Sequence, residues 1–233
     1  MMRRSFSLSV VLLGASISLS LAASSAHAEP LAPHQPHLQA SLGLRVSKVP
    51  DAGYDVFSNS DELAQLSLGL AGTLWRHQRF SLAAAGFWDY GQKGSNVRGS
   101  NTDLVVHRLT IGPEARYHLL PPLYFFVHVL PAFAHSSASL DDGVAQVTRY
   151  ARHWSYGVDA SAGAAFEVYG ARSGESFRTR LWAMAEGGYG YLGSTSLELS
   201  PDAGQGPQRP APVDLGSLSL AGPYFRVSAA VGF

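Results

Sequence analysis

The chain closes on FRVSAAVGF, residues 225–233, and this stretch decides how the rest is understood. Apolar side chains stand at every second position, namely Phe225, Val227, Ala229, Val231 and Phe233, with polar or small residues between them. Alternation with a period of two is typical of a β-strand whose two faces meet different surroundings. We therefore predict a closing strand with one apolar face and an aromatic carboxy terminus.

The same alternation recurs upstream, and segments rich in Gly, Ser, Asn, Asp and Pro separate its runs. We predict eight strands, at residues 37–48, 63–74, 80–90, 107–119, 123–134, 154–168, 178–191 and roughly 218–233. Short connections (75–79, 120–122, 169–177) alternate with long ones (49–62, 91–106, 135–153, 192–217). Tight turns on one side and longer loops on the other are typical of an outer-membrane barrel. The predicted fold is an all-β, eight-stranded antiparallel up-and-down transmembrane β-barrel.

The polar face of these strands mixes charged residues with many small ones. Long charged residues usually dominate a solvated surface, whereas small side chains fit the narrow interior of an eight-stranded barrel. A soluble, lipocalin-like barrel with the apolar face inside is the alternative. Buried charges must pair, so we predict a lumen charge network that braces a closed interior, with an ion path as the alternative. Its residues are Arg108, Glu114, Arg116, Asp159, Glu167, Arg180, Glu186 and Arg226.

The apolar face carries aromatic residues near the strand ends, which predicts the two belts that mark membrane–water interfaces. We expect one belt toward the long connections, from Trp88, Tyr90, Trp154, Tyr156, Tyr189 and Tyr191. We expect the other toward the short turns, from Tyr117, Phe125, Phe225 and Phe233. Pro113 and Pro131 fall within predicted strands, where proline cannot donate to the ladder, so they mark bulges or strand ends.

The first 28 residues have the pattern of a secretory signal peptide. Arg3 and Arg4 precede a short apolar run, and Ala26–His27–Ala28 resembles a cleavage site. Residues 29–36 are then a periplasmic linker, and residues 37–233 are the barrel. The chain has no cysteine, which excludes disulfides and thiol chemistry. Without Arg3 and Arg4, 15 basic and 17 acidic residues remain, so no excess of positive charge favours nucleic acid.

The run GPYFRVSAAVGF, residues 222–233, resembles the closing strand of small bacterial outer-membrane barrels such as the OmpA transmembrane domain, OmpX and OmpW. The resemblance implies export to the outer membrane of a Gram-negative-type cell envelope. It also implies that the barrel assembly machinery recognises Phe225, Val227, Val231 and Phe233 as a membrane-insertion signal. The implied partners are this machinery, outer-membrane lipid and lipopolysaccharide.

Few residues suggest chemistry. His135–Ser136–Ser137, followed by Asp141 and Asp142, resembles the His–x–Ser of outer-membrane lipid A deacylases, but Ala138 stands where those enzymes have Asn. The next glutamate, Glu167, lies deep in the following strand. The other histidines lack metal-ligand spacing, and the Pro- and Gly-rich segment 201–213 is expected to be a surface loop.

The sequence thus predicts a non-enzymatic barrel without metal or cofactor. Its expected role is structural and interfacial, with four extracellular loops that meet an external ligand. A narrow, porin-like pore for small or apolar solutes is the alternative, and a lipid A hydrolase is the third.

Overall fold

The computed structural model describes residues 37–97, 100–142, 147–170, 179–201 and 211–233. The predicted signal peptide (1–28) and linker (29–36) lie outside the described residues. Within the described part of the chain, no helix is long and apolar enough to cross a membrane.

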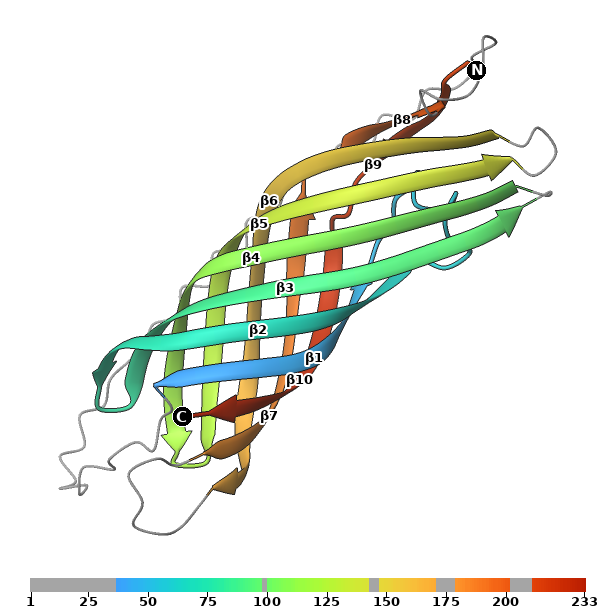
Figure 1. The fold of residues 1–233 in the computed structure, drawn as a ribbon. Helices are drawn as coiled ribbons and strands as arrows, with labels where there is room; N and C mark the ends of the chain where they lie inside the picture. The colour runs from blue at the N-terminus through green and yellow to red at the C-terminus, as the bar shows by residue number, and fades with distance from the viewer. Residues whose placement is uncertain (1–36, 98–99, 143–146, 171–178, 202–210) are drawn as a thin grey trace, which may run out of the picture. The chain divides into compact units, whose positions relative to one another are not determined.

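The described part of the chain forms ten strands (Figure 1). They are β1 (Leu38–Lys48), β2 (Glu62–His77), β3 (Phe80–Val97), β4 (Ser100–Leu120), β5 (Leu123–Asp142), β6 (Val147–Gly170), β7 (Arg180–Leu192), β8 (Thr195–Pro201), β9 (Val213–Leu218) and β10 (Gly222–Gly232). Eight of them pair in the order β5–β4–β3–β2–β1–β10–β7–β6, and the pairing of β5 with β6 closes the ring. Every pairing is antiparallel, so the predicted eight-stranded antiparallel barrel is confirmed.

The apolar face of the barrel points outward. On β2, the apolar face is exposed and the polar face is buried. Leu70 on the apolar face is 62% exposed, whereas Ser67 on the polar face is 2% exposed. The same holds across β5, where Val129 is exposed and His128 is buried. A soluble barrel shows the reverse arrangement, because burial of apolar surface drives its folding. The polar face is therefore the inner one, as predicted.

The two ends of the described chain meet at the barrel seam. β1 pairs with β10 from Gln39↔Gly232 to Ser47↔Tyr224. The amide of His37 donates to the carbonyl of Phe233 at 2.6 Å, and the amide of Phe233 donates to the carbonyl of Leu38 at 2.9 Å. This end also carries the tight β2–β3 and β4–β5 turns (Figure 1). We call it the turn end and the opposite one the loop end.

The predicted place of Phe225 in the turn-end belt is wrong. Phe225 stands opposite Val46, close to the end of β1. It therefore lies toward the loop end, and only Phe233 of this strand lies at the turn end. The closing strand is shorter than predicted, which shifts Phe225 from its middle to its beginning.

Two of the four predicted long loops are wrong as well. Residues 91–106 and 135–153 mostly continue β3, β4, β5 and β6, which reach Val97, Ser100, Asp142 and Val147. The polar composition of these segments suggested loops, but several of their inward positions are apolar. Leu104, Val106, Ala138 and Ala151 are all buried there. Alternation persists because this inner face has a core to pack against.

The long connection after β7 contains the strands β8 and β9, which pair with each other and form a hairpin. β8 also pairs with β6 through Arg149↔Pro201 and Tyr150↔Ser200. Most of the predicted surface loop 201–213, residues 202–210, lies outside the described residues.

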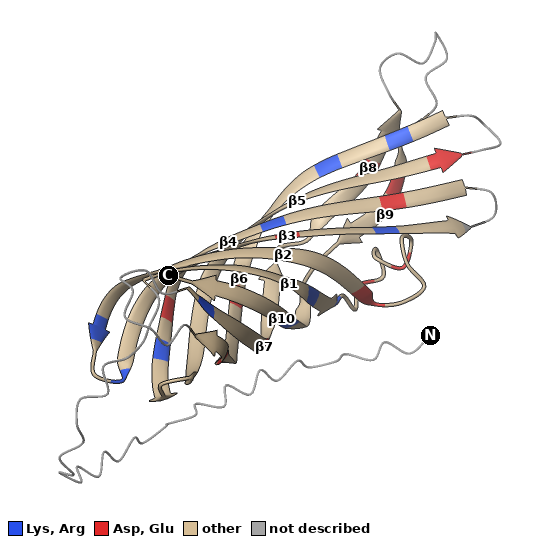
Figure 2. Cartoon of the chain, turned by 60° about the horizontal axis from the view of Figure 1, so that its bottom comes forward, with Lys and Arg blue, Asp and Glu red and all other residues tan. Residues whose placement is uncertain are grey.

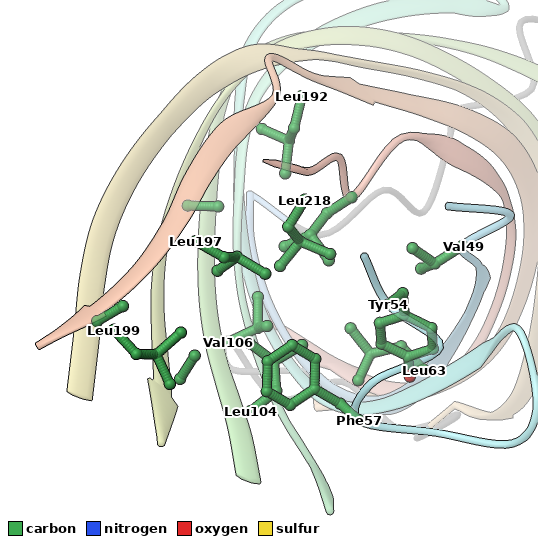
Figure 3. Close-up of a cluster of buried hydrophobic side chains, with 14 of the residues drawn as sticks. Val49, Tyr54, Phe57, Leu63, Leu104, Val106, Leu192, Leu197, Leu199 and Leu218 are labelled. Atoms are coloured by element: carbon green, nitrogen blue, oxygen red, sulfur yellow. The ribbon is translucent and has the colours of Figure 1, made fainter. Parts of the chain in front are cut away.

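A cluster of buried apolar side chains, which we call the outer core, fills the loop end of the barrel (Figure 3). Strands β4, β5 and β6 line it from one side, and Tyr54 and Phe57, both fully buried, enter from the β1–β2 connection. The β8–β9 hairpin adds Leu197, Leu199 and Leu218. The outer core therefore ties the β1–β2 connection and the hairpin to the extended strands.

Pro113 and Pro131 neither end their strands nor produce a simple bulge. They lie on the exposed face of β4 and β5, at opposite ends of an unpaired stretch in the β4–β5 ladder. The ladder pairs Thr110 with Ala132, resumes at Glu114 opposite His128, and has no pairs between these two points. Two prolines remove two donors from facing strands, which accounts for the interruption.

Candidate functional site: the charged lumen and the outer rim

Arg45 on β1 is the centre of the ion pairs that cross the lumen. Its Nη1 atom lies 3.0 Å from Oδ2 of Asp89 on β3 and 2.7 Å from Oδ2 of Asp159 on β6. Arg108 on β4 forms an ion pair with the other oxygen of Asp159. All four side chains are at most 3% exposed, so each charge depends on its partners rather than on solvent.

Arg226 on β10 extends this set. Its Nη2 atom lies 3.0 Å from Oδ2 of Asp89, and its Nη1 atom lies 2.6 Å from Oε1 of Glu186 on β7. The guanidinium of Arg226 also lies over the ring of Phe87, at 4.1 Å from the centroid. The result is a chain of alternating sign that links six strands, which we call the outer charge chain: Arg108–Asp159–Arg45–Asp89–Arg226–Glu186.

A second charge cluster lies nearer the turn end. Arg116 Nε donates to Glu114 Oε1 at 2.5 Å, and Nδ1 of His128 lies 3.4 Å from Glu114 Oε2. The other ring nitrogen of His128 lies 2.6 Å from Oγ of Ser161 and 3.7 Å from Oε2 of Glu186. His128 therefore connects this cluster to the outer charge chain.

His128 contacts Ser161 through one ring nitrogen and Glu114 through the other. A nucleophile, a base and an orienting acid would need contacts in this order. The side chains of His128 and Glu114 are both 1% exposed, however. The lumen cavity lined by Glu114, Arg116 and Phe87 has a volume of about 10 Å³, room for about one water molecule. His128 and Ser161 also border a groove of about 540 Å³, together with apolar residues such as Val127 and Val129. Because the side chains of His128 and Glu114 are buried, we interpret the arrangement as a brace of the barrel.

The predicted network thus separates into three groups. Arg108, Asp159, Glu186 and Arg226 belong to the outer charge chain, and Glu114 and Arg116 belong to the second cluster. Glu167 and Arg180 form a pair of their own, at 2.8 Å, where β6 and β7 approach the turn end.

The predicted network omitted three members: Arg45, Asp89 and His128. All three stand on the inner face of their strands, so alternation alone was a sufficient signal for their position.

The structure does not assemble the predicted hydrolase motif. His135 and Ser137 share the outward face of β5, whereas Ser136 is buried on the inner face. No hydrogen bond joins His135 to Ser137 in the described part of the chain, and Glu167 lies at the far end of β6. Nor does any group of three or more His, Cys, Asp or Glu side chains among the described residues fit a metal ion.

His135 instead belongs to a row of rings on the outside of the barrel, which we call the outer rim row. Four residues stand directly opposite one another across β3, β4, β5 and β6, in the order Tyr90, His107, His135 and Trp154. Their neighbouring ring centroids are 5.1, 6.4 and 4.9 Å apart. The sequence predicted the aromatic members as part of a belt but not the two histidines between them.

An eight-stranded antiparallel barrel with an apolar outside, belts of rings and an ion-paired inside has the architecture of small bacterial outer-membrane barrels. The chain is similar to Ail, the attachment invasion locus protein of Yersinia pestis, at 11% identity and a TM-score of 0.46 over 85% of this chain and 99% of that one. Ail in complex with the heparin analogue sucrose octasulfate gives 12% identity and a TM-score of 0.48 over the same shares.

Neisserial surface protein A is similar at 13% identity and a TM-score of 0.38, over 84% of this chain and 96% of that one. No protein-family model matches the chain, and no curated protein matches it significantly.

Proposed function

We propose that this chain is an outer-membrane barrel that holds a rigid surface for interaction outside the cell. The exposed apolar side chains around the barrel support the membrane location, because water would penalise so much apolar surface. They include Leu70, Leu74, Ile111, Val129 and Tyr156, each at least 58% exposed. Both termini of the described barrel lie at the turn end, which the proposal assigns to the periplasm.

The observation that carries the interaction role is the outer core beneath the extended strands. β3 to β6 continue past the barrel ring, and their outer stretches carry charged residues (Figure 2). Asp103, Asp141 and Arg152 lie on the outward side of these stretches. The outer core holds the strands that present these residues in place. Binding a partner would therefore order little additional chain and lose little conformational entropy.

The filled lumen argues against the alternative of a narrow pore. The outer charge chain spans six of the eight ring strands, and the outer core lies beyond it toward the loop end. A solute path would require several buried ion pairs to separate, and each separation is costly.

The absence of native cysteine permits a direct topology experiment. We would introduce Asn101→Cys at the loop end or Arg79→Cys at the turn end, both exposed positions, and treat whole cells with a membrane-impermeant maleimide. We expect Asn101→Cys to react on intact cells and Arg79→Cys to react only after lysis. The opposite pattern, or recovery of the protein in the soluble fraction, would overturn the proposal.

The same protein would be added to planar bilayers after refolding. We expect no steady conductance from barrels that show the folded, heat-modifiable band on a gel. Sustained unit conductance from that folded band would favour the pore.

A further inference from the structure

The two histidines of the outer rim row occupy a boundary on the outside of the barrel. One step toward the turn end, the facing positions are apolar: Leu109 stands opposite Phe133, which packs edge-on against Tyr156 with ring centroids 5.7 Å apart. One step toward the loop end, the facing positions are Val105, Ser137 and Arg152. Rings of this kind gather where hydrocarbon meets lipid headgroups.

His107 and His135 form a directly opposed cross-strand pair within this boundary. Both are half-buried between larger rings: His107 stacks against Trp88 at 5.9 Å, and His135 packs against Trp154 at 4.9 Å. The rings hold the imidazoles side by side, and their nitrogen atoms make no hydrogen bond within the described part of the chain. Two adjacent imidazoles thus present nitrogen atoms that have no hydrogen-bond partner among the described residues.

Arg152 lies two residues closer to the loop end than this histidine pair. Arg152 is exposed, faces the same side as Trp154, and stands opposite Ser137, which is two residues from His135 on β5. It forms no ion pair or hydrogen bond in the described part of the chain. Diagonal positions of this kind are about 7–8 Å apart at the backbone, within reach of an arginine side chain. The outward carboxylates on β4 and β5, Asp103 and Asp141, lie one and two steps farther from the membrane boundary than Arg152. On β8, the exposed Glu198 lies two residues from Ser200, which stands opposite Tyr150 of β6, and it forms no ion pair with Arg152 in the described part of the chain.

We propose that His107, His135 and Arg152 bind the phosphate group of an outer-leaflet lipid. This inference rests on the proposed membrane location and adds a ligand class and a site to it. The guanidinium supplies a charge-assisted contact to phosphate oxygen, and the imidazole N–H groups and the Ser137 hydroxyl supply further donors. The lipid chains lie along the apolar face below, beside Leu109 and Phe133. Two imidazoles are fewer than the three protein ligands of typical catalytic zinc sites, so the donor set suits an anion better than a metal.

The test uses the full mature barrel, purified in a neutral detergent and titrated with a short-chain phosphatidic acid. Native mass spectrometry would count lipid-bound and lipid-free protein, and a short-chain phosphatidylcholine would be the comparison lipid. We expect one tight phosphatidic acid adduct. Arg152→Gln should weaken it about tenfold, which corresponds to about 1.4 kcal/mol for the lost contact between the guanidinium and the phosphate. The double variant His107→Gln/His135→Gln should weaken it by a similar factor.

Arg149→Gln is the matched control, since it removes the same charge from the same strand three residues away but on the inner side. It should leave the adduct unchanged. Equal loss in Arg149→Gln and Arg152→Gln, or no loss in either, would overturn the inference. Displacement of the lipid by an equal concentration of inorganic phosphate would assign the site to a free anion and overturn the lipid assignment.

The gel-mobility shift on boiling, measured for every variant, separates this inference from the proposed function. If the shift and the membrane location persist while Arg152→Gln binds the lipid as tightly as the unsubstituted protein, only the proposed lipid site is wrong. If the unsubstituted barrel is not recovered in the membrane, the proposed function fails first.

Discussion

At the scale of single residues, Arg45 links two carboxylates in the middle of the outer charge chain. It is 1% exposed and contacts two carboxylates, Asp89 and Asp159, that come from strands on different parts of the ring. Each carboxylate has one further arginine partner, Arg226 or Arg108. Removing Arg45 would therefore leave two buried negative charges undercompensated rather than one.

We predict that Arg45→Met lowers the free energy of unfolding by about 3 kcal/mol, the lower end of the cost of breaking a buried ion pair, because both carboxylates keep one partner. Urea unfolding of the refolded barrel, followed by tryptophan fluorescence, measures this. Arg79→Met, an exposed arginine in the β2–β3 turn, should change stability by less than about 0.5 kcal/mol. An Arg45 variant as stable as this control would show that the ion pairs contribute little.

Tyr54 in the β1–β2 connection provides a pH-dependent prediction. Burial raises the pKa of its phenol from 10.0 to about 12, and its hydroxyl donates to the carbonyl of Glu62 at 2.9 Å. The folded protein therefore holds this proton more tightly than the unfolded chain does. The stabilisation is complete below about pH 10 and is lost as the pH rises toward 12. Stability should fall less steeply across this range in Tyr54→Phe, and equal slopes in urea unfolding would contradict the assignment.

Alternation along each strand was enough to predict which residues point inward, but not which of them would meet. Arg45 and Asp159 lie on β1 and β6, which do not pair with each other. They touch because the lumen is narrow and the strands are staggered, and stagger depends on the closed ring rather than on any one strand. Alternation also puts His128 on the inner face of β5, yet its contact with Glu186 depends on the distance across the lumen.

At the scale of elements, the extended strands show where composition misleads. The segments QKGSNV (92–97) and HSSASLDD (135–142) have the composition of loops, yet they are strand. The deciding signal was the apolar residues at alternate positions of β4 and β5, such as Leu104, Val106 and Leu140, and the polar residues around them obscured it. These segments form strands because their inward apolar side chains have something to pack against. The β1–β2 connection and the β8–β9 hairpin supply the other half of the outer core. No local pattern could reveal that partner.

The outer core should therefore control the loop end without controlling the barrel. Phe57→Ala removes a fully buried ring from it and should cost about 3 kcal/mol locally. We expect limited proteolysis in detergent to cut the β1–β2 connection and the β8–β9 hairpin several-fold faster, while the boiled and unboiled bands still differ. Leu74→Ala, at a 70% exposed outward position, should leave proteolysis unchanged. Loss of the folded band in Phe57→Ala would show instead that the outer core and the barrel fold as one unit.

At the scale of the whole molecule, the barrel depends on its seam, and the last residue belongs to that seam. Phe233 exchanges backbone hydrogen bonds with Leu38, and its ring is 39% exposed on the outside. Any residue at this position could form the same backbone hydrogen bonds. The proposed recognition by the assembly machinery, in contrast, would depend on the aromatic ring. A substitution that removes the ring but keeps the backbone hydrogen bonds can therefore separate barrel closure from recognition by the assembly machinery.

We predict that Phe233→Ala refolds into detergent with nearly the yield of the unsubstituted chain, because the seam hydrogen bonds remain. In cells, the amount of heat-modifiable protein in the membrane fraction should fall several-fold, since the proposed insertion signal has lost its aromatic end. Phe125→Ala is the matched control, because Phe125 is also an outward aromatic residue near the turn end, at 47% exposure. If both variants lose the same amount in cells, the effect of Phe233 is that of a belt residue. If Phe233→Ala fails to refold even in detergent, its ring is required for closure and the two roles cannot be separated.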